Sequence, residues 1–412
     1  MLVLVINCGS SSLKYELFDA TEETSLASGL ADRVGIGGGG DAKLTYRPSS
    51  GDAIERSVPI PDHRVAVALV IEALTDPEHG VIESLSDIGA IGHRVVHGGE
   101  QFTESVWITP EVIQAVEKFS ELAPLHNPAN LIGIRACQEL FPGVPNVAVF
   151  DTAFHQTMPQ HSYLYGIPYE VYEDLGVRRY GFHGTSHRYV AELGGKMLLE
   201  RGVAAEEQKI VTCHLGNGCS MAAVKGGRSV DTTLGFTPLE GLLMGTRCGD
   251  LDPALVPFLM DRLGLDLREI DVFLNKKSGL LGVSGVGSDM RDVRAAAEKG
   301  NKRAQAALDL FCYRVRKYIG AYAAAMGGIH AVVFTAGIGE NDPVVRARCV
   351  EGLEFLGLAI DEGRNADPAI CGAVADISAP GASAWVFVIP TDEELLIARD
   401  TAALLLPAAR RG

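Results

Sequence analysis

The chain has 412 residues, of which 47% are hydrophobic and 21% are charged, and its formal net charge is −16. This length is enough for two domains with separate cores, and the composition is ordinary for a globular enzyme. The negative charge argues against nucleic acid or a membrane surface as a partner. It does not exclude nucleotides, because a few arginines in a cleft can hold a polyphosphate inside an acidic protein.

Three further features of composition narrow the class of protein. Eight cysteines are scattered without a CxxC pair, which predicts reduced thiols in the cytoplasm rather than a disulfide frame or a zinc site. The start of the chain reaches a polar turn after six residues and has no basic region, so we expect no signal peptide. Residues 318–339 are strongly apolar, but Gly327 and Gly328 interrupt them, which predicts helix, turn and buried strand instead of a membrane span.

The first predicted element is an apolar strand that leads through a glycine-serine turn into a second strand, over residues 3–18. Residues 210–224 repeat this pattern. Small residues let backbone N–H groups approach an anion closely, and serine hydroxyls add further donors. Two such hairpins suggest two related halves that hold a phosphorylated ligand between them.

The remaining elements alternate between helix and strand. Apolar periodicity predicts helices at residues 65–75 and near 302–326, and strands at residues 88–97, 145–151, 331–337 and 384–390. A final helix is expected from about Thr391, with Thr391 and Glu394 spaced as a capping box. These elements predict an α/β chain with mixed sheets flanked by helices. We expect a domain boundary near residue 150, which gives domains at 1–150 and 151–390, with residues 391–412 packing back on the first.

The common nucleotide-binding motifs do not explain how this chain would bind a nucleotide. The glycines of residues 35–41 fit GxGxxG, but the following segment, 42–48, has the composition of a strand, so the helix that a Rossmann motif requires is missing. We interpret these glycines as a surface loop. The P-loop, protein-kinase, GxSxG and HExxH patterns are also absent from the sequence.

Polar residues follow several predicted strands, where ligands of open α/β sheets bind. Asn7 and Asp151 each end such a strand, although strand ends also simply return to solvent. Arg94 and Arg247 lie in glycine-rich segments, and arginine binds carboxylate or phosphate with two parallel hydrogen bonds. The structural alternatives are a half-buried strand for Arg94 and an ion pair with Asp250 or Asp252 for Arg247.

Two histidines and one glutamate complete the candidates from local pattern. His183 precedes a predicted helix that Thr185 or Ser186 would cap, a suitable place for a donor to a phosphoryl group. His126 precedes a proline turn and is ambiguous by itself. Glu393 lies in the first turn of the final helix, where it either complements the helix dipole or acts as an oxygen ligand for Mg²⁺.

At these residues the chain closely resembles the acetate/propionate kinase family. The matching segments are NCGSSSLK (7–14), GHRVVHGGE (92–100), LAPLHNP (122–128), VFDTAFHQTMP (149–159), YGFHGTSH (180–187), CHLGNG (213–218), GFTPLEGLLMGTRCGDLDP (235–253), FTAGIGEN (334–341) and IPTDEE (389–394). The resemblance implies two duplicated α/β domains of the acetate and sugar kinase/heat-shock chaperone/actin type, with the nucleotide in the cleft between them. It also implies a homodimer in the cytoplasm.

The resemblance also implies roles for particular residues. The catalytic residues would be Arg94, His126, Asp151, His183 and Arg247, with Arg94 also binding substrate. Asn7 and Glu393 would hold Mg²⁺, for which Mn²⁺ substitutes. The substrate methyl group would lie against Val96, Leu125, Phe182 and Pro238. The nucleotide would contact Ser12, Lys14, His214, Leu215, Gly216, Asn217, Gly218, Asp289, Met290, Arg291, Gly337, Ile338, Gly339, Glu340 and Asn341.

The expected reaction is reversible, direct in-line transfer of the ATP γ-phosphoryl group to acetate, giving acetyl phosphate and ADP. A phospho-enzyme on a carboxylate such as Asp151 is the competing route. Propionate, or another short-chain acid, is the alternative acceptor, since one methylene in an apolar pocket changes binding by only about 1–3 kcal/mol. Val96 favours the small acetate pocket. An ATP-driven binding protein of the actin or chaperone type is the alternative from another functional class.

Overall fold

The computed structural model describes residues 1–36, 42–124 and 126–405. These residues form two compact units. Unit 1 comprises Met1–Phe154 and the described part of Asp392–Gly412, and unit 2 comprises His155–Thr391. The division therefore falls four residues after the expected boundary and places Asp151 in unit 1, together with the final helix.

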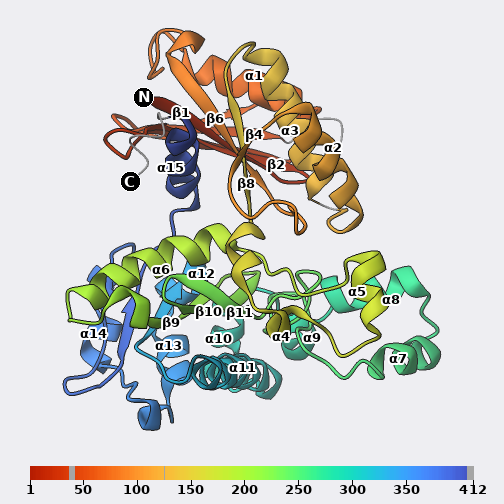
Figure 1. Ribbon diagram of the computed structural model, residues 1–412, viewed down its shortest axis with the longest axis vertical. Helices are drawn as coiled ribbons and strands as arrows, with labels where there is room; N and C mark the ends of the chain where they lie inside the picture. The colour runs from red at the N-terminus through yellow and green to blue at the C-terminus, as the bar shows by residue number, and fades with distance from the viewer. Residues whose placement is uncertain (37–41, 125, 406–412) are drawn as a thin grey trace. The chain divides into compact units, whose positions relative to one another are not determined.

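Unit 1 contains a mixed sheet of eight strands among its described residues (Figure 1). Its strands are β1 (Leu2–Cys8), β2 (Ser12–Asp19), β3 (Thr24–Asp32), β4 (Lys43–Pro48), β5 (Ile54–Ser57), β6 (Ile88–Val95), β7 (Val106–Trp107) and β8 (Asn146–Phe150). Its helices are α1 (His63–Leu74), α2 (Pro110–Lys118), α3 (Asn127–Leu140) and α15 (Glu393–Leu405). The strand order is β5-β4-β3-β2-β1-β6-β8-β7, with β1, β6 and β8 mutually parallel.

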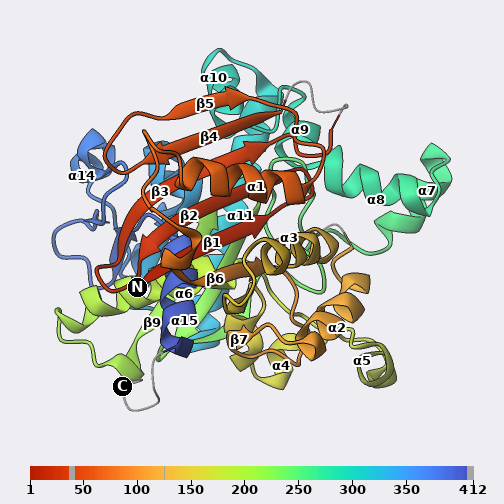
Figure 2. The ribbon, with the colours of Figure 1, turned by 90° about the horizontal axis from the view of Figure 1, so that it is seen from above.

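The two faces of the unit 1 sheet have different partners. Leu4, Ile6 and Cys8 of β1 join a core that includes apolar side chains of α1 and α3, and Figure 2 shows these two helices over the sheet. Because side chains alternate along a strand, Asn7 faces the other side. Helix α15 covers that side, since a Cβ at Gly92 of β6 would collide with Ile397 of α15.

Unit 2 repeats this plan with a six-stranded sheet of order β11-β10-β9-β12-β14-β13 among its described residues. Its strands are β9 (Lys209–Leu215), β10 (Cys219–Lys225), β11 (Arg228–Thr232), β12 (Ala331–Thr335), β13 (Ala375–Asp376) and β14 (Trp385–Val388). Its helices are α4 (Gln160–Tyr163), α5 (Tyr169–Leu175), α6 (Gly184–Leu199), α7 (Leu255–Leu263), α8 (Leu267–Lys276), α9 (Gly279–Ser284), α10 (Met290–Glu298), α11 (Lys302–Met326), α12 (Ala336–Asn341), α13 (Pro343–Val350) and α14 (Glu362–Ala366).

Helices α6 and α11 cover opposite faces of the unit 2 sheet (Figure 1). Gly194 of α6 lies close to Ile210 and Val333, so a side chain there would crowd the strands. Helix α11 begins after the Asn301 cap and ends at Gly327, whose φ of 70° needs glycine. The predicted helix, turn and strand within residues 318–339 are thus the end of α11, the Gly327–Gly328 turn and β12, although the strand ends at Thr335 and α12 follows it directly. No helix in the described ranges has both the length and the apolar composition of a membrane span.

The strand orders reveal the duplication. In unit 1, β3-β2-β1 are antiparallel and β6 and β8 then add in parallel; in unit 2, β11-β10-β9 are antiparallel and β12 and β14 add in the same way. The two predicted hairpins, β1–β2 and β9–β10, are the equivalent central pairs. The predicted fold class, two duplicated α/β domains of the actin-like type, is confirmed.

Two local predictions have different outcomes. The strand predicted after the glycine loop is β4, but residues 37–41 of that loop lie outside the described residues. The capping box at the final helix is wrong. Asp392 Oδ1 accepts the N–H of Leu395, Thr391 instead donates to Ser186, and Glu394 pairs with Lys14. An aspartate directly before the helix caps it more closely than the threonine one residue earlier.

Candidate active site

The candidate residues of unit 1 gather on one face of its sheet, at the carboxyl ends of three parallel strands. The register pairs Ile6 with His93 and Arg94 with Val149, so Asn7, Arg94 and Asp151 follow one another across β1, β6 and β8 on the same side. This is the side covered by the start of α15, which supplies Glu393. Strand alternation and register therefore assemble four residues that are far apart in the chain.

Arg94 is held by Asp151 through two hydrogen bonds. Arg94 Nε donates to Oδ1 at 2.9 Å and Nη2 donates to Oδ2 at 2.5 Å. Asp151 is almost completely buried. Arg94 Nη1 also lies 3.4 Å from Asn7 Oδ1, and its Nε lies 3.8 Å from Glu393 Oε2. Burial acts against the charge of Arg94, but the carboxylates of Asp151 and Glu393 outweigh it and raise the pKa of the guanidinium.

Carboxylates outnumber cations in this part of unit 1. The pKa of Glu393 is raised to about 7. Burial is the largest cause, Arg94 counteracts it, and the carboxylates of Asp151 and Glu394 act in the same direction as burial. Lys14 Nζ pairs with Glu394 Oε1 at 2.7 Å. An additional cation would relieve this excess. Carboxylate and amide oxygens such as those of Glu393 and Asn7 are the ligands that Mg²⁺ prefers, so the donor set fits that ion.

The donor set also limits how such an ion is held. Among the described residues, no three His, Cys, Asp or Glu side chains are arranged to bind a metal ion. Mg²⁺ commonly uses one or two protein ligands together with water and substrate phosphates. The residues of unit 1 therefore fit an ion that binds together with a phosphorylated substrate, rather than a closed structural metal site.

The other candidates of unit 1 take the following positions. Val96 is buried just after β6, with its N–H bonded to Asn130 Oδ1 at 3.1 Å. His126 is half-buried at the position before α3. Ser12 begins β2, close in sequence to Lys14. Leu125, predicted to contact the substrate methyl group, lies outside the described residues.

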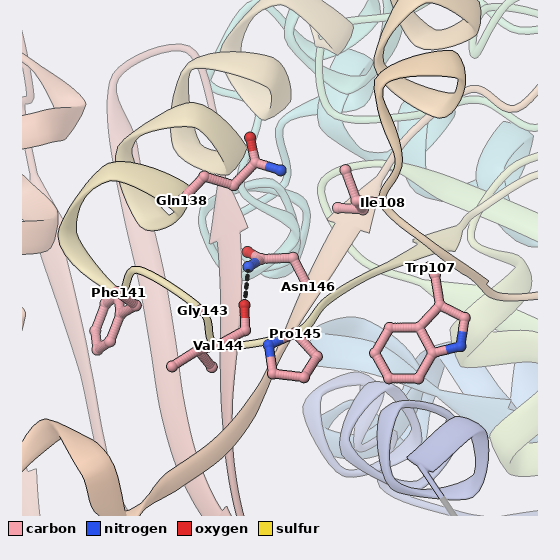
Figure 3. A pocket seen from close by; sticks show the side chains of 8 residues that line it. All are labelled: Trp107, Ile108, Gln138, Phe141, Gly143, Val144, Pro145 and Asn146. Atoms are coloured by element: carbon pink, nitrogen blue, oxygen red, sulfur yellow. Dashed lines mark hydrogen bonds between the residues drawn. The ribbon is translucent and has the colours of Figure 1, made fainter.

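Unit 1 also has a cavity of about 340 Å³ away from these residues (Figure 3). It is lined by Trp107, Ile108, Gln138, Phe141, Gly143, Val144, Pro145 and Asn146. Asn146 begins β8, whereas Asp151 follows its other end. The lining has no charged side chain, so this cavity lacks the groups that bind a phosphate or carboxylate.

In unit 2, His183 occupies a conformation that the sequence did not predict. We expected Thr185 or Ser186 to cap α6, but His183 itself precedes the helix at its N-cap position, with φ 56° and ψ 26°. The left-handed region is uncommon for a non-glycine residue, and such outliers cluster at functional sites. His183 Nδ1 lies 2.8 Å from Ser220 Oγ, and the ring stacks on His214 at 4.3 Å. His214 Nδ1 is in turn 2.8 Å from Ser186 Oγ.

Arg247 lies beside the same turn. A Cβ added to Gly218 would lie 3.7 Å from Arg247 Nη1 and 3.8 Å from His183 Nε2. Arg247 Nη1 donates to the carbonyl of Pro238 at 3.2 Å. The glycine turn and two nitrogen donors thus meet at one point in unit 2.

The ion-pair alternative for Arg247 is wrong. Asp250 pairs with Arg314 instead, and no carboxylate in the described ranges lies within ion-pair distance of Arg247. Burial lowers the pKa of Arg247, and Cys219 acts slightly in the opposite direction. A half-buried arginine without a carboxylate is suited to receive an anion from solution.

A cavity of about 640 Å³ in unit 2 joins three predicted nucleotide-binding segments. It is lined by Gly216, Asn217, Ser288, Asp289, Met290, Arg291, Arg294, Gly337, Ile338, Asn341 and Asp342. Ser288, Arg294 and Asp342 were missed by the sequence reasoning. Asp342 caps α13 directly before Pro343, and this Asp-Pro pair was the signal that could have found it.

The other residues predicted to bind the nucleotide lie partly in unit 2 and partly in unit 1. His214, Leu215 and Gly218 flank the lining residues on the β9–β10 turn, and Gly339 and Glu340 belong to α12. Ser12 and Lys14 belong to unit 1. Phe182 is buried and Pro238 is half-buried in unit 2, whereas Val96 is in unit 1.

A buried arginine supports helix α12, and sequence reasoning missed it. Arg346 is 1% exposed. Its Nη1 donates to the carbonyls of Gly339 and Glu340, and its Nε donates to Asn365 Oδ1. Glu340 Oε1 accepts the N–H of Ala336, a residue with a φ of 64°. These bonds fix helix α12, which borders the 640 Å³ cavity.

Comparisons with known proteins agree on one family. The model of the acetokinase family matches residues 2–399. The acetate kinase of Desulfitobacterium hafniense is 56% identical over 401 residues, covering 97% of this chain and 98% of the relative. The crystal structure of Porphyromonas gingivalis acetate kinase has a TM-score of 0.92 and 47% identity, and covers 98% of this chain and 100% of that one. A propionate kinase from Francisella tularensis has a TM-score of 0.88 and 40% identity, with coverage of 97% and 99%.

Proposed function

The chain belongs to the acetokinase family, and from this premise we propose that it transfers the γ-phosphoryl group of ATP reversibly to acetate, giving acetyl phosphate and ADP. The roles that we propose for its residues depend on one observation. Unit 1 presents an arginine oriented by a carboxylate, and unit 2 presents an arginine without one beside a glycine turn. The first arrangement suits a small carboxylate acceptor, and the second suits a phosphoryl group.

The chemistry places few demands on acid–base catalysis. Acetate is ionised at neutral pH, so the nucleophile needs no general base. The difficulty is the approach of two anions, which at ~4 Å repel by about 4 kcal/mol at an effective dielectric constant of 20. Arg94 would bind the acceptor carboxylate, and Arg247 and His183 would donate to the transferring phosphoryl group. Donors directed at charge that develops in the transition state lower the barrier.

We propose that Asn7 and Glu393 hold Mg²⁺, with Mn²⁺ as a substitute. When bound, the ion would neutralise phosphate charge. Asp151 fixes the guanidinium plane of Arg94 through two hydrogen bonds. Lys14 forms an ion pair with Glu394 and so compensates its charge. His126, half-buried before α3, would line the acceptor side. The nucleotide base and ribose would occupy the 640 Å³ cavity of unit 2.

Direct in-line transfer fits the contacts better than a phospho-enzyme. Both carboxylate oxygens of Asp151 accept hydrogen bonds from Arg94, which makes that carboxylate a poor nucleophile. We therefore expect inversion of configuration at a chiral γ-phosphorus, whereas retention would support the two-step route. The experiment uses the intact enzyme with acetate and chiral ATP.

Acetate is the proposed acceptor, with propionate as the alternative within the family. Kinetics with acetate, propionate and butyrate at saturating ATP and Mg²⁺ test this order. Trapping of acetyl phosphate as its hydroxamate tests the reaction itself. Release of ADP at the same rate without acetate, and without hydroxamate formation, would instead indicate an ATP-driven binding protein.

We also propose that the protein is a cytoplasmic homodimer. Its eight cysteines are free, as suits a reducing compartment. Helix α7 and the start of α8 expose Leu255, Phe258, Leu263 and Leu267, and a closed two-fold pair is the commonest way to cover such a surface. Phe258→Glu is expected to yield monomers in sedimentation or light scattering, and a wild-type monomer would contradict the proposal.

A further inference from the structure

A chain of three buried polar side chains leads away from His183 into the core of unit 2. Ser220 Oγ lies 2.8 Å from His183 Nδ1 and 2.7 Å from His187 Nε2. On the other side of the second ring, His187 Nδ1 lies 2.7 Å from Thr212 Oγ1. Ser220, His187 and Thr212 are each completely buried.

The fold explains why these residues meet. Register pairs Ser220 of β10 with His214 of β9, so Ser220 and Thr212 lie on the sheet face that α6 covers. His183 and His187 are four residues apart, one helical turn, and both point to that face. The chain is therefore part of the packing of α6 on the sheet.

The positions of the protons follow from the distances. Thr212 has one hydroxyl proton and two acceptors within range, His187 Nδ1 at 2.7 Å and the carbonyl of Ala222 at 3.4 Å. O–H donors prefer 2.5–3.0 Å, so the proton belongs to the first contact. His187 then carries its own proton on Nε2 and donates to Ser220. Ser220 donates in turn to His183 Nδ1, because a neutral imidazole has one donor and one acceptor nitrogen.

We propose that Thr212, Ser220 and His187 are positioning residues that keep His183 neutral, with its proton on Nε2, so that it presents an N–H donor at the glycine turn without being protonated. This inference deepens the proposed phosphotransfer and rests on it for the identity of the acceptor. Each hydroxyl and ring N–H in the chain donates in the direction of His183. This fixed direction selects the Nε2–H tautomer of His183 over the Nδ1–H tautomer.

A neighbouring cation in unit 2 favours a neutral His183. Arg247 lies beside the same Gly218 turn, and a second charge there would be repelled. Among the contacts within unit 2, the ring of His214 lies against both histidines and the ring of His155 lies against His187. Burial, together with His155 and His214, lowers the pKa of His187 well below its ordinary value, so His187 also stays neutral.

Thr212→Val tests the direction of the chain, because valine keeps the shape of threonine and removes its hydroxyl proton, three hydrogen bonds away from His183. Both tautomers of His183 should then be populated. We expect kcat at neutral pH to fall about 10- to 100-fold with the KM for ATP unchanged. The rate should recover as the pH is lowered toward about 6, where protonation restores the Nε2 donor. Thr212→Ser should restore both the rate and the pH profile.

Ser229→Ala is the matched control, since it removes a buried hydroxyl that lies 2.8 Å from Nδ1 of His155, outside this chain. It should leave the pH profile unchanged. A uniform loss of activity at all pH values in Thr212→Val, without rescue by serine, would mean a merely structural role and would overturn the proposal.

A spectroscopic readout separates this proposal from the proposed function. Nitrogen NMR of the ¹⁵N-histidine-labelled full-length protein should show the Nε2–H tautomer at His183, assigned by loss of its signals in His183→Gln. Thr212→Val should shift those signals toward the average of two tautomers. An Nδ1–H tautomer in the wild type would overturn the inference even in an active enzyme. The expected tautomer in a protein that forms no acetyl phosphate would refute only the phosphotransfer assignment.

Discussion

Arg94 and Asp151 form a two-bond ion pair in which the carboxylate is almost completely buried. Removing one partner of such a pair leaves a buried charge without compensation, which commonly costs about 3–5 kcal/mol. Arg247, in contrast, has no carboxylate partner among the described residues. The two arginines should therefore respond differently to mutation, although both are assigned to the same reaction.

Arg247→Ala is expected to lower kcat by about 10³–10⁵, the range found for arginines that stabilise a transferring phosphoryl group, with little change in stability. Arg94→Ala is expected to lower activity comparably and to lower the urea midpoint as well, because Asp151 loses its partner. Steady-state kinetics and urea unfolding of both variants test this contrast. Arg314→Ala, which removes the partner of Asp250 outside the site, should retain turnover. Near-normal turnover in either active-site variant would refute its assignment.

Val96→Ala tests the basis of acceptor choice. Val96 is buried directly after Arg94 and Val95. If the guanidinium of Arg94 binds the carboxylate, as we propose, the smaller side chain should leave room for one more methylene nearby. We expect kcat/KM for propionate relative to acetate to rise by roughly 10-fold or more, as is typical for one methylene in an apolar pocket. The comparison uses both acids at saturating ATP. An unchanged ratio would place the methyl group elsewhere.

The sequence predicted the elements that carry the candidate residues of each unit, because the signals for these elements are local. Asn7 is the last residue but one of the first apolar strand, and Asp151 directly follows another. The repeated hairpin identified equivalent strands of the two units. The role of each residue came from resemblance to the family. Neither source gave the bidentate contact of Arg94, which depends on the register of β6 and β8.

Other features could not be predicted, since they depend on contacts between distant segments. The left-handed conformation of His183 violates local preference and is tolerated because Ser220 and His214 hold the ring. Arg346 resembles any surface arginine in the sequence, yet it is buried and donates to carbonyls of helix α12. The sequence thus predicts which elements carry the candidate residues. It does not predict the contacts that depend on strand register or on hydrogen bonds between distant segments.

Gly245→Ala is expected to weaken nucleotide binding. A Cβ at this position would lie 1.9 Å from Oδ1 of Asn217, a residue that lines the 640 Å³ cavity, so Asn217 must move. We expect the KM for ATP to rise while the KM for acetate stays close to normal. Gly320→Ala is the control, because a Cβ there meets no atom within 4 Å. Unchanged nucleotide binding in Gly245→Ala would show that Asn217 does not contact the nucleotide.

Buried histidines should make the stability of the protein depend on pH. Burial lowers the pKa of His93 from 6.5 to about 4, although its hydrogen bond to Asn146 acts in the opposite direction. Between these two pH values the unfolded chain binds a proton at His93 that the folded chain does not. The free energy of unfolding should therefore fall as the pH is lowered from about 6.5 to about 4, by on the order of 3 kcal/mol for this residue over the whole window.

His93→Gln should remove this contribution, because glutamine does not titrate and can still donate to Asn146. The expected result is a shallower fall of the urea midpoint with decreasing pH than in the wild type, with the smallest difference between the two slopes above pH 6.5, where His93 is neutral in both states. His79→Gln, at a surface position where the ring is largely exposed, is the control and should leave the slope unchanged. Identical slopes in His93→Gln and the wild type would mean that His93 is protonated alike in the folded and unfolded chains. The acid sensitivity would then have to come from other buried histidines, such as His97, His155 and His187.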